Sequence, residues 1–179
     1  MKIPILTSQR IELKPLDRSY CSESYVGWMN DPEVYKYMDS RGNYTLDKLE
    51  AYLASVEDSD MLFWAIIIKD SGKHIGNIKI DPVNTVHNFA EYGIMMGDRS
   101  EWGKGYAFEA SQLVLDYCFK SLKIRKINLG VVDENVNGVR LYKKLGFVVE
   151  GVFRKHLVYD SNYYDSIKMA LFNPDNIYC

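Results

Sequence analysis

The sequence predicts an α/β (α+β) protein with a mixed, mostly antiparallel central sheet of about seven strands, including one parallel pair, flanked by helices. Two observations predict this fold. The apolar runs at residues 61–69 and 74–80 are joined by Asp-Ser-Gly-Lys, a turn sequence, and so form an antiparallel hairpin. The apolar run at residues 126–132 follows a helical segment, and a strand reached through such a crossover pairs in parallel with the strand before it, at residues 88–96.

The N-terminal segment predicts a strand followed by a helix. Residues 10–14 alternate between apolar and polar side chains and end at Pro15, which predicts a first strand. Asp17 is predicted to cap the helix that carries Tyr25 and Trp28. These aromatic side chains are interpreted as part of the core.

The remaining elements are marked by their end residues. Thr45 is predicted to cap a helix that has one apolar stripe. Asn135 begins the last helix, and Gly146 stands where a C-terminal glycine ends it. Residues 147–154 and 163–171 then form a final antiparallel hairpin.

Composition limits the class of protein. A chain of 179 residues fits one domain, residues 1–179, and a formal net charge of −2 argues against general nucleic-acid binding. The three cysteines share no metal-ligand spacing, so neither a disulfide framework nor a metal site is expected. No apolar run reaches the ~20 residues that cross a bilayer. A cytoplasmic protein without a membrane partner is expected.

Residues 99–117 are the stretch around which the chain is organised, because a glycine-spaced turn runs directly into an amphipathic helix. Gly103 and Gly105 lack a Cβ atom, so their backbone can adopt a positive φ and approach a ligand closely. The N–H groups of residues 103–107 precede the first intrahelical bond and, with the helix dipole, favour an anion. The turn is therefore predicted to bind a pyrophosphate, with Lys104 as a nearby charge. Taken alone, Gly-Lys-Gly is more often a plain turn, and it matches neither a P-loop nor a dinucleotide motif.

Two further segments flank this turn. Residues 89–96, Phe-Ala-Glu-Tyr-Gly-Ile-Met-Met, form a strand-like run with one carboxylate, and residues 135–142 contain Asn-x-x-Gly-x-x-Leu-Tyr. In this order and spacing, the three pieces resemble the GNAT superfamily of acyl-CoA N-acyltransferases. Within it they resemble the branch of ribosomal-protein N-terminal (Rim-type) and amino-sugar acetyltransferases. The resemblance spans residues 7–171 and implies the GNAT fold, in which the parallel pair splays apart, with acetyl-CoA as cosubstrate.

The resemblance also implies residue roles. Tyr142 would protonate the departing thiolate, Asn135 would help to hold the cofactor, and the backbone of residues 94–96 would pair with the pantetheine arm. The full set of expected cofactor-binding residues is Ile94, Met95, Met96, Trp102, Gly103, Lys104, Gly105, Tyr106, Ala107, Asn135, Gly138 and Tyr142. The Arg or Gln that often stands three residues before the first glycine in the family is replaced here by Ser100.

Glu91 is the candidate base. An ammonium group with a pKa of ~10 must lose a proton before it can attack a thioester. Strand alternation places Glu91 on one face with Phe89 and Gly93, in a setting expected to be partly dry. A surface carboxylate, or one that only binds substrate, remains an equal alternative.

The sequence therefore predicts an acetyl-CoA-dependent N-acetyltransferase that acts on a primary amine. A small molecule such as an amino sugar is preferred as substrate. The sequence Gly-Ile-Met-Met-Gly-Asp at residues 93–98 resembles that of relatives that acetylate amino sugars or other small amines. A peptide amine, as in protein N-terminal acetyltransferases, is the second substrate class. A non-catalytic acetyl-CoA-binding module is the other alternative, although it would need neither Glu91 nor Tyr142. A monomer and a homodimer are both compatible with the sequence.

Overall fold

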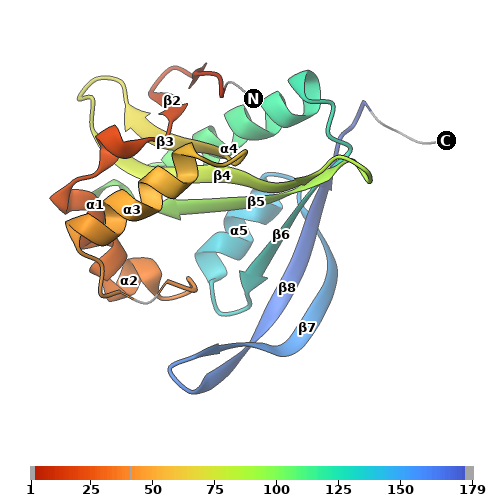
Figure 1. Cartoon of the computed structure of the whole chain (residues 1–179). Helices are drawn as coiled ribbons and strands as arrows, with labels where there is room; N and C mark the ends of the chain where they lie inside the picture. Colours follow the sequence, from red (N-terminus) through yellow and green to blue (C-terminus); the bar gives the residue numbers. More distant parts are fainter. Residues whose placement is uncertain (1–2, 41, 176–179) are drawn as a thin grey trace. The chain divides into compact units, whose positions relative to one another are not determined.

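The computed structural model describes residues 3–40 and 42–175. They form an eight-stranded mixed sheet with the strand order β1-β2-β3-β4-β5-β6-β8-β7 and flanking helices (Figure 1). The predicted fold class is confirmed, with one strand more than expected. The chain divides into two compact units. The first unit is Met1–Ile80 with Gly93–Leu113, and the second is Asp81–Tyr92 with Val114–Cys179.

The strands are β1 (Leu6–Thr7), β2 (Ile11–Pro15), β3 (Leu62–Ile68), β4 (His74–Asn84), β5 (Phe89–Met96), β6 (Lys126–Val132), β7 (Val148–Tyr159) and β8 (Asn162–Phe172). The α-helices are α1 (Glu23–Asn30), α2 (Pro32–Tyr35), α3 (Leu46–Glu57), α4 (Tyr106–Asp116) and α5 (Val136–Lys144). Short helical turns occur at Arg18–Tyr20, Arg99–Glu101 and Tyr117–Ser121.

In the first unit, β1 to β4 are antiparallel neighbours, so the predicted hairpin of β3 and β4 is confirmed. Helices α1 and α3 lie over β3 (Figure 1). Tyr25 of α1, Leu49 and Leu53 of α3, and Phe63 and Ala65 of β3 are buried in one apolar cluster. Burial of these side chains holds the helices on the sheet.

One predicted helix start is wrong. Asp17 caps only the short turn at Arg18–Tyr20, where it accepts a hydrogen bond from the Ser19 N–H. The backbone is extended at Cys21, which interrupts the helical path, and Ser22 then caps α1 by accepting from the Tyr25 N–H. Both residues are good caps, but the chain uses two of them in succession.

The second unit contains the parallel pair and the long terminal hairpin. β5 runs parallel to β6, with Glu91 opposite Asn128. β8 is antiparallel to both β6 and β7. The β7–β8 hairpin is longer than predicted and turns at Asp160 and Ser161, whose φ values of 48° and 66° suit a two-residue hairpin turn (Figure 1).

Candidate active site

The glycine turn before α4 has the predicted backbone geometry. Asp98 caps the helical turn at Arg99–Glu101, and α4 begins at Tyr106. Between them, Gly103 and Gly105 have φ values of +76° and +86°. These values lie in the left-handed region, where a Cβ atom is unfavourable, so both positions favour glycine.

The turn presents free backbone donors. In α4 the Glu109 N–H makes the first bond, to the Gly105 carbonyl at 3.1 Å. Among the described residues, no hydrogen-bond partner accepts from the N–H groups of residues 103–107. A Cβ at Gly103 would meet nothing within 4 Å, and one at Gly105 would meet only Arg10 Nη2 at 3.5 Å. Open space above free donors at a helix N-terminus fits the pyrophosphate of acetyl-CoA.

Lys104, the predicted nearby charge, is already engaged. Its Nζ lies 2.8 Å from Glu101 Oε2, and Lys73 also reaches Glu101, at 3.1 Å, and Asp98, at 2.7 Å. Hydrogen bonds from Lys104 and Lys73 hold the pKa of Glu101 below its usual value. The network ties the turn to the β3–β4 hairpin and pairs the charge of Lys104 with a carboxylate.

Trp102 and Met96 are brought together in this unit. The Trp102 indole N–H donates to the Met96 carbonyl at 2.9 Å. That carbonyl is therefore used within the chain, although Met96 is among the residues expected to pair with pantetheine. The side chains of Ile94 and Met95, from the same strand, are half-buried.

Arg10 and Glu109 form a contact that sequence patterns did not reveal. Glu109, in the first turn of α4, accepts from Ser8 Oγ at 2.5 Å, from the Arg10 backbone N–H at 3.2 Å and from Arg10 Nε at 2.7 Å. Burial raises the pKa of Glu109, but the bonds from Ser8 and Arg10 outweigh it and leave the pKa below its usual value.

This shift predicts a pH-dependent stability. Because the pKa of Glu109 is lower in the folded chain than in the unfolded chain, its contribution is present near neutral pH and is lost as the pH falls below the ordinary carboxyl range. Replacing Glu109 by Gln is expected to flatten the decline of the free energy of unfolding between about pH 5 and 3. Denaturant unfolding across this range measures it. Equal slopes for parent and variant would contradict the prediction.

In the second unit, Asn135 and Gly138 are explained by helix capping. Asn135 Oδ1 accepts from the Gly138 N–H at 3.0 Å at the start of α5, as predicted. A Cβ at Gly138 would lie 2.9 Å from Asn135 Nδ2, so glycine gives the cap room. The cap orients α5, which carries Tyr142.

Tyr142 is buried at 9% exposure, with its ring edge-on to Tyr92 and Phe147 at centroid distances of 5.8 and 6.0 Å. Burial raises the pKa of Tyr142 to about 12, so the phenol stays protonated at neutral pH. Its hydroxyl has no hydrogen bond to another residue in the described part of the chain. A fixed, protonated phenol with an uncommitted hydroxyl can donate a proton or a hydrogen bond.

Glu91 lies in the middle of β5 and is exposed. The partly dry setting expected for it is therefore not found. Asn128 stands opposite Glu91 on β6, and its Oδ1 atom is buried without a hydrogen-bond partner among the described residues. A buried acceptor of this kind is costly unless a ligand satisfies it. Sequence reasoning missed Asn128, although a polar residue within the apolar run of β6 could have marked it.

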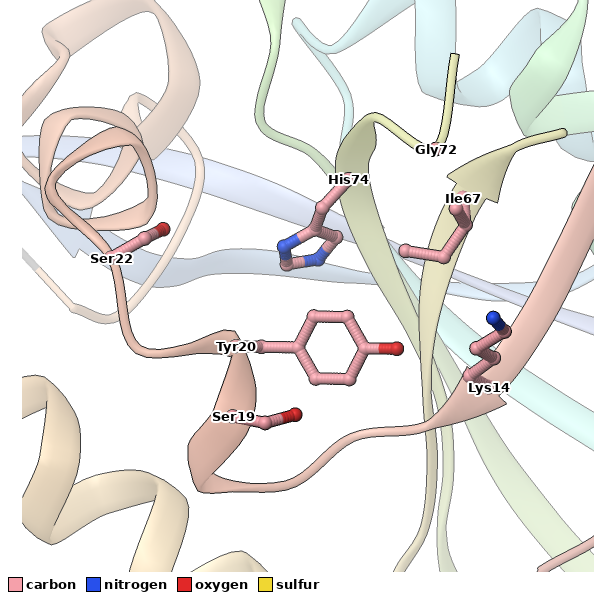
Figure 2. A pocket seen from close by; sticks show the side chains of 7 residues that line it. All are labelled: Lys14, Ser19, Tyr20, Ser22, Ile67, Gly72 and His74. Atoms are coloured by element: carbon pink, nitrogen blue, oxygen red, sulfur yellow. The ribbon is translucent and has the colours of Figure 1, made fainter. Parts of the chain in front are cut away.

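The first unit also contains a cavity of about 320 Å³ between β2, β3 and the segment before α1 (Figure 2). Its lining residues are Lys14, Ser19, Tyr20, Ser22, Ile67, Gly72 and His74. The His74 Nε2 lies 3.0 Å from the Gly76 carbonyl oxygen and 2.9 Å from Asn77 Oδ1. Burial lowers the pKa of His74, which favours the neutral ring. None of the residues predicted for cofactor binding or catalysis lines this cavity.

Comparison with known proteins decides the family. Residues 10–148 match the model of the acetyltransferase (GNAT) domain. The chain belongs to the GNAT acetyltransferase family. It is therefore an acetyl-CoA-dependent N-acetyltransferase, and the alternative of a non-catalytic binding module is set aside.

Individual GNAT proteins resemble the chain over most of its length. The spermidine N(1)-acetyltransferase of Escherichia coli K12 is 30% identical over 93% of this chain and 88% of its own length. The crystal structure of a spermidine N-acetyltransferase from Vibrio cholerae in complex with CoA and spermine has a TM-score of 0.82 and 26% identity, covering 93% of this chain and 97% of that one. A GNAT-family acetyltransferase from Bacillus anthracis has a TM-score of 0.84 and 22% identity over 95% and 99% of the two chains, and shares the fold.

Membrane-spanning helices and metal-binding clusters are both absent from the described residues. None of their helices is both long and apolar enough to cross a membrane. Within residues 3–40 and 42–175, no group of three or more His, Cys, Asp or Glu side chains is arranged to hold a metal ion.

Proposed function

We propose that this GNAT enzyme transfers the acetyl group of acetyl-CoA to a primary amine of a small polyamine such as spermidine. The observation that carries the proposal is the 30% identity to a spermidine N(1)-acetyltransferase over 93% of the chain. The similar structure that holds CoA and spermine supports the same substrate class. This proposal refines the expected small-molecule amine and replaces the amino sugar as first candidate.

We take the chain to act as one domain. Its residues are assigned to cofactor binding, deprotonation of the amine, substrate binding and protonation of the leaving thiolate. The turn at residues 103–107 binds the pyrophosphate through backbone N–H groups. Glu91 accepts a proton from the ammonium group, directly or through water, and its exposed carboxylate also attracts a polycation. Asn128 Oδ1, which lacks a partner among the described residues, accepts a hydrogen bond from the substrate nitrogen. Tyr142 donates a proton to the leaving thiolate.

Replacing Glu91 by Gln is expected to lower the turnover of spermidine, and most strongly at low pH. The amide keeps the size of the side chain and loses its basicity, and at low pH the amine is most fully protonated. The pH profile of kcat/KM measures the effect. The matched control is Glu150→Gln, since Glu150 is a carboxylate of the same unit that pairs with Lys126. A profile equal to that of the parent would leave Glu91 as a binding or surface group.

A panel of amines tests the proposed substrate class. Spermidine, spermine, glucosamine and a short peptide with a free N-terminus are each incubated with acetyl-CoA, and released CoA thiol is followed. The proposal expects the highest kcat/KM for the polyamines, with monoacetylated spermidine identified by mass spectrometry. Preferred acetylation of the peptide would establish the N-terminal acetyltransferase alternative, and preferred acetylation of glucosamine would restore the amino sugar.

A further inference from the structure

Among the described residues, each side-chain cation of the glycine turn is paired with a carboxylate. Ser100 is uncharged, Arg99 pairs with Asp31 at 3.3 Å, and Lys104 pairs with Glu101 at 2.8 Å. A pyrophosphate carries several negative charges, and charge-assisted hydrogen bonds hold such groups more strongly than neutral donors do. A cation from elsewhere in the chain would complete the site.

Arg10, immediately before β2, reaches the turn. Its Nη1 donates to the Lys104 carbonyl at 3.0 Å, and its Nη2 lies 3.5 Å from the position that a Cβ on Gly105 would occupy. The guanidinium is therefore adjacent to the glycine whose φ of +86° opens the turn. It lies beside the same free N–H groups that are assigned to the pyrophosphate.

The Arg10 side chain is held in place although it is 46% exposed. Its Nε and Nη2 contact Glu109 Oε2 at 2.7 and 2.5 Å, and the guanidinium carbon lies 4.7 Å from the centre of the Tyr106 ring. A side chain fixed in this way loses little conformational freedom when it binds a ligand. These contacts, with that to Lys104, use one N–H of each of the three guanidinium nitrogens, which leaves two of the five N–H donors for a ligand.

The ion pair between Arg10 and Glu109 also changes the charge beside the glycine turn. Its carboxylate lies in the first turn of α4, at the end of the helix that attracts anions. Left alone, this charge would repel a phosphate at the turn. The ion pair with Arg10 offsets that charge and leaves the positive end of the helix available.

We propose that Arg10 is the side-chain cation of the cofactor site, where it contacts a phosphate of acetyl-CoA beside Gly105 and fixes the turn through the Lys104 carbonyl. This inference rests on the proposed cofactor role of the turn. It adds to the site a residue that lies 94 positions before Lys104 in the sequence.

Calorimetric titration of the purified protein with CoA, and separately with pantetheine, tests the inference. Arg10→Gln is expected to weaken CoA binding about tenfold or more, as loss of a charged hydrogen-bond donor does. It is also expected to make the affinity less dependent on salt, since one cation is lost. Binding of pantetheine, which lacks the phosphates, is expected to stay unchanged. The matched control is Arg18→Gln, because Arg18 pairs with Glu57 at 2.8 Å in the same unit and takes no part in the turn.

A double variant separates direct contact from a role through Glu109. If Arg10 contacts phosphate, Arg10→Gln weakens CoA binding in the Glu109→Gln background as well. An effect that disappears in that background would overturn the inference, and so would equal losses for CoA and pantetheine or an unchanged affinity for CoA. If the folded parent protein binds no CoA, the cofactor site itself fails, and this outcome is distinct from binding that does not depend on Arg10.

Discussion

Replacing Tyr142 by Phe is expected to cut kcat by ~10²-fold while the affinity for acetyl-CoA stays nearly unchanged, as removal of a general acid does. The ring packs against Tyr92 and Phe147, and Phe preserves that packing. Burial raises the pKa of Tyr142 to about 12, so the phenol is fully protonated and can donate at neutral pH. Steady-state kinetics with spermidine, together with calorimetric titration of acetyl-CoA, measure the two quantities.

The control for this variant is Tyr163→Phe, because Tyr163 is 67% exposed on β8 of the same unit. A loss of affinity with kcat preserved would mean that the Tyr142 hydroxyl only binds the cofactor. A variant as active as the parent would remove Tyr142 from the mechanism and make water the proton donor.

The second large effect is expected at Gly105. Gly105→Val should reduce acetyl-CoA affinity by about tenfold or more, because a β-branched residue resists a positive φ and places methyl groups where the phosphate must approach the backbone. The φ of +86° at this position makes the strain unavoidable. Calorimetry on protein shown by circular dichroism to be folded measures the affinity.

The control for Gly105→Val is Gly72→Val, which introduces similar backbone strain away from the glycine turn. Gly72 also has a positive φ, +67°, and a Cβ there would meet nothing within 4 Å. This variant should lose stability in the same way and keep its affinity for acetyl-CoA. If Gly105→Val binds acetyl-CoA as tightly as the parent, the glycine turn does not hold the cofactor.

Much of the fold could be predicted because its causes are local in sequence. The turn between residues 69 and 74 marked the β3–β4 hairpin, and the crossover helix required β5 and β6 to be parallel. Caps at Thr45 and Asn135 depend only on residues three positions ahead. The positive φ values at Gly103 and Gly105 followed from the same local reasoning.

The features that were missed arise from contacts between distant segments. Arg10 and Glu109 are 99 positions apart, and no periodicity links them. Asn128 Oδ1 has no hydrogen-bond partner within the described part of the chain, and its burial opposite Glu91 depends on the register of β5 and β6. The exposure of Glu91 also depends on tertiary structure. Strand alternation predicts which face of the sheet carries the side chain, but it does not predict whether that face is covered.

In the proposed cofactor site, acetyl-CoA binds through the backbone N–H groups of residues 103–107. Amide NMR spectra of the isotope-labelled protein, recorded during titration with CoA, test it most directly. The amide resonances of these five residues are expected to shift together, with a dissociation constant equal to that from calorimetry. Titration with pantetheine is expected to leave them in place. Saturation with CoA while these five resonances stay unmoved would contradict the account.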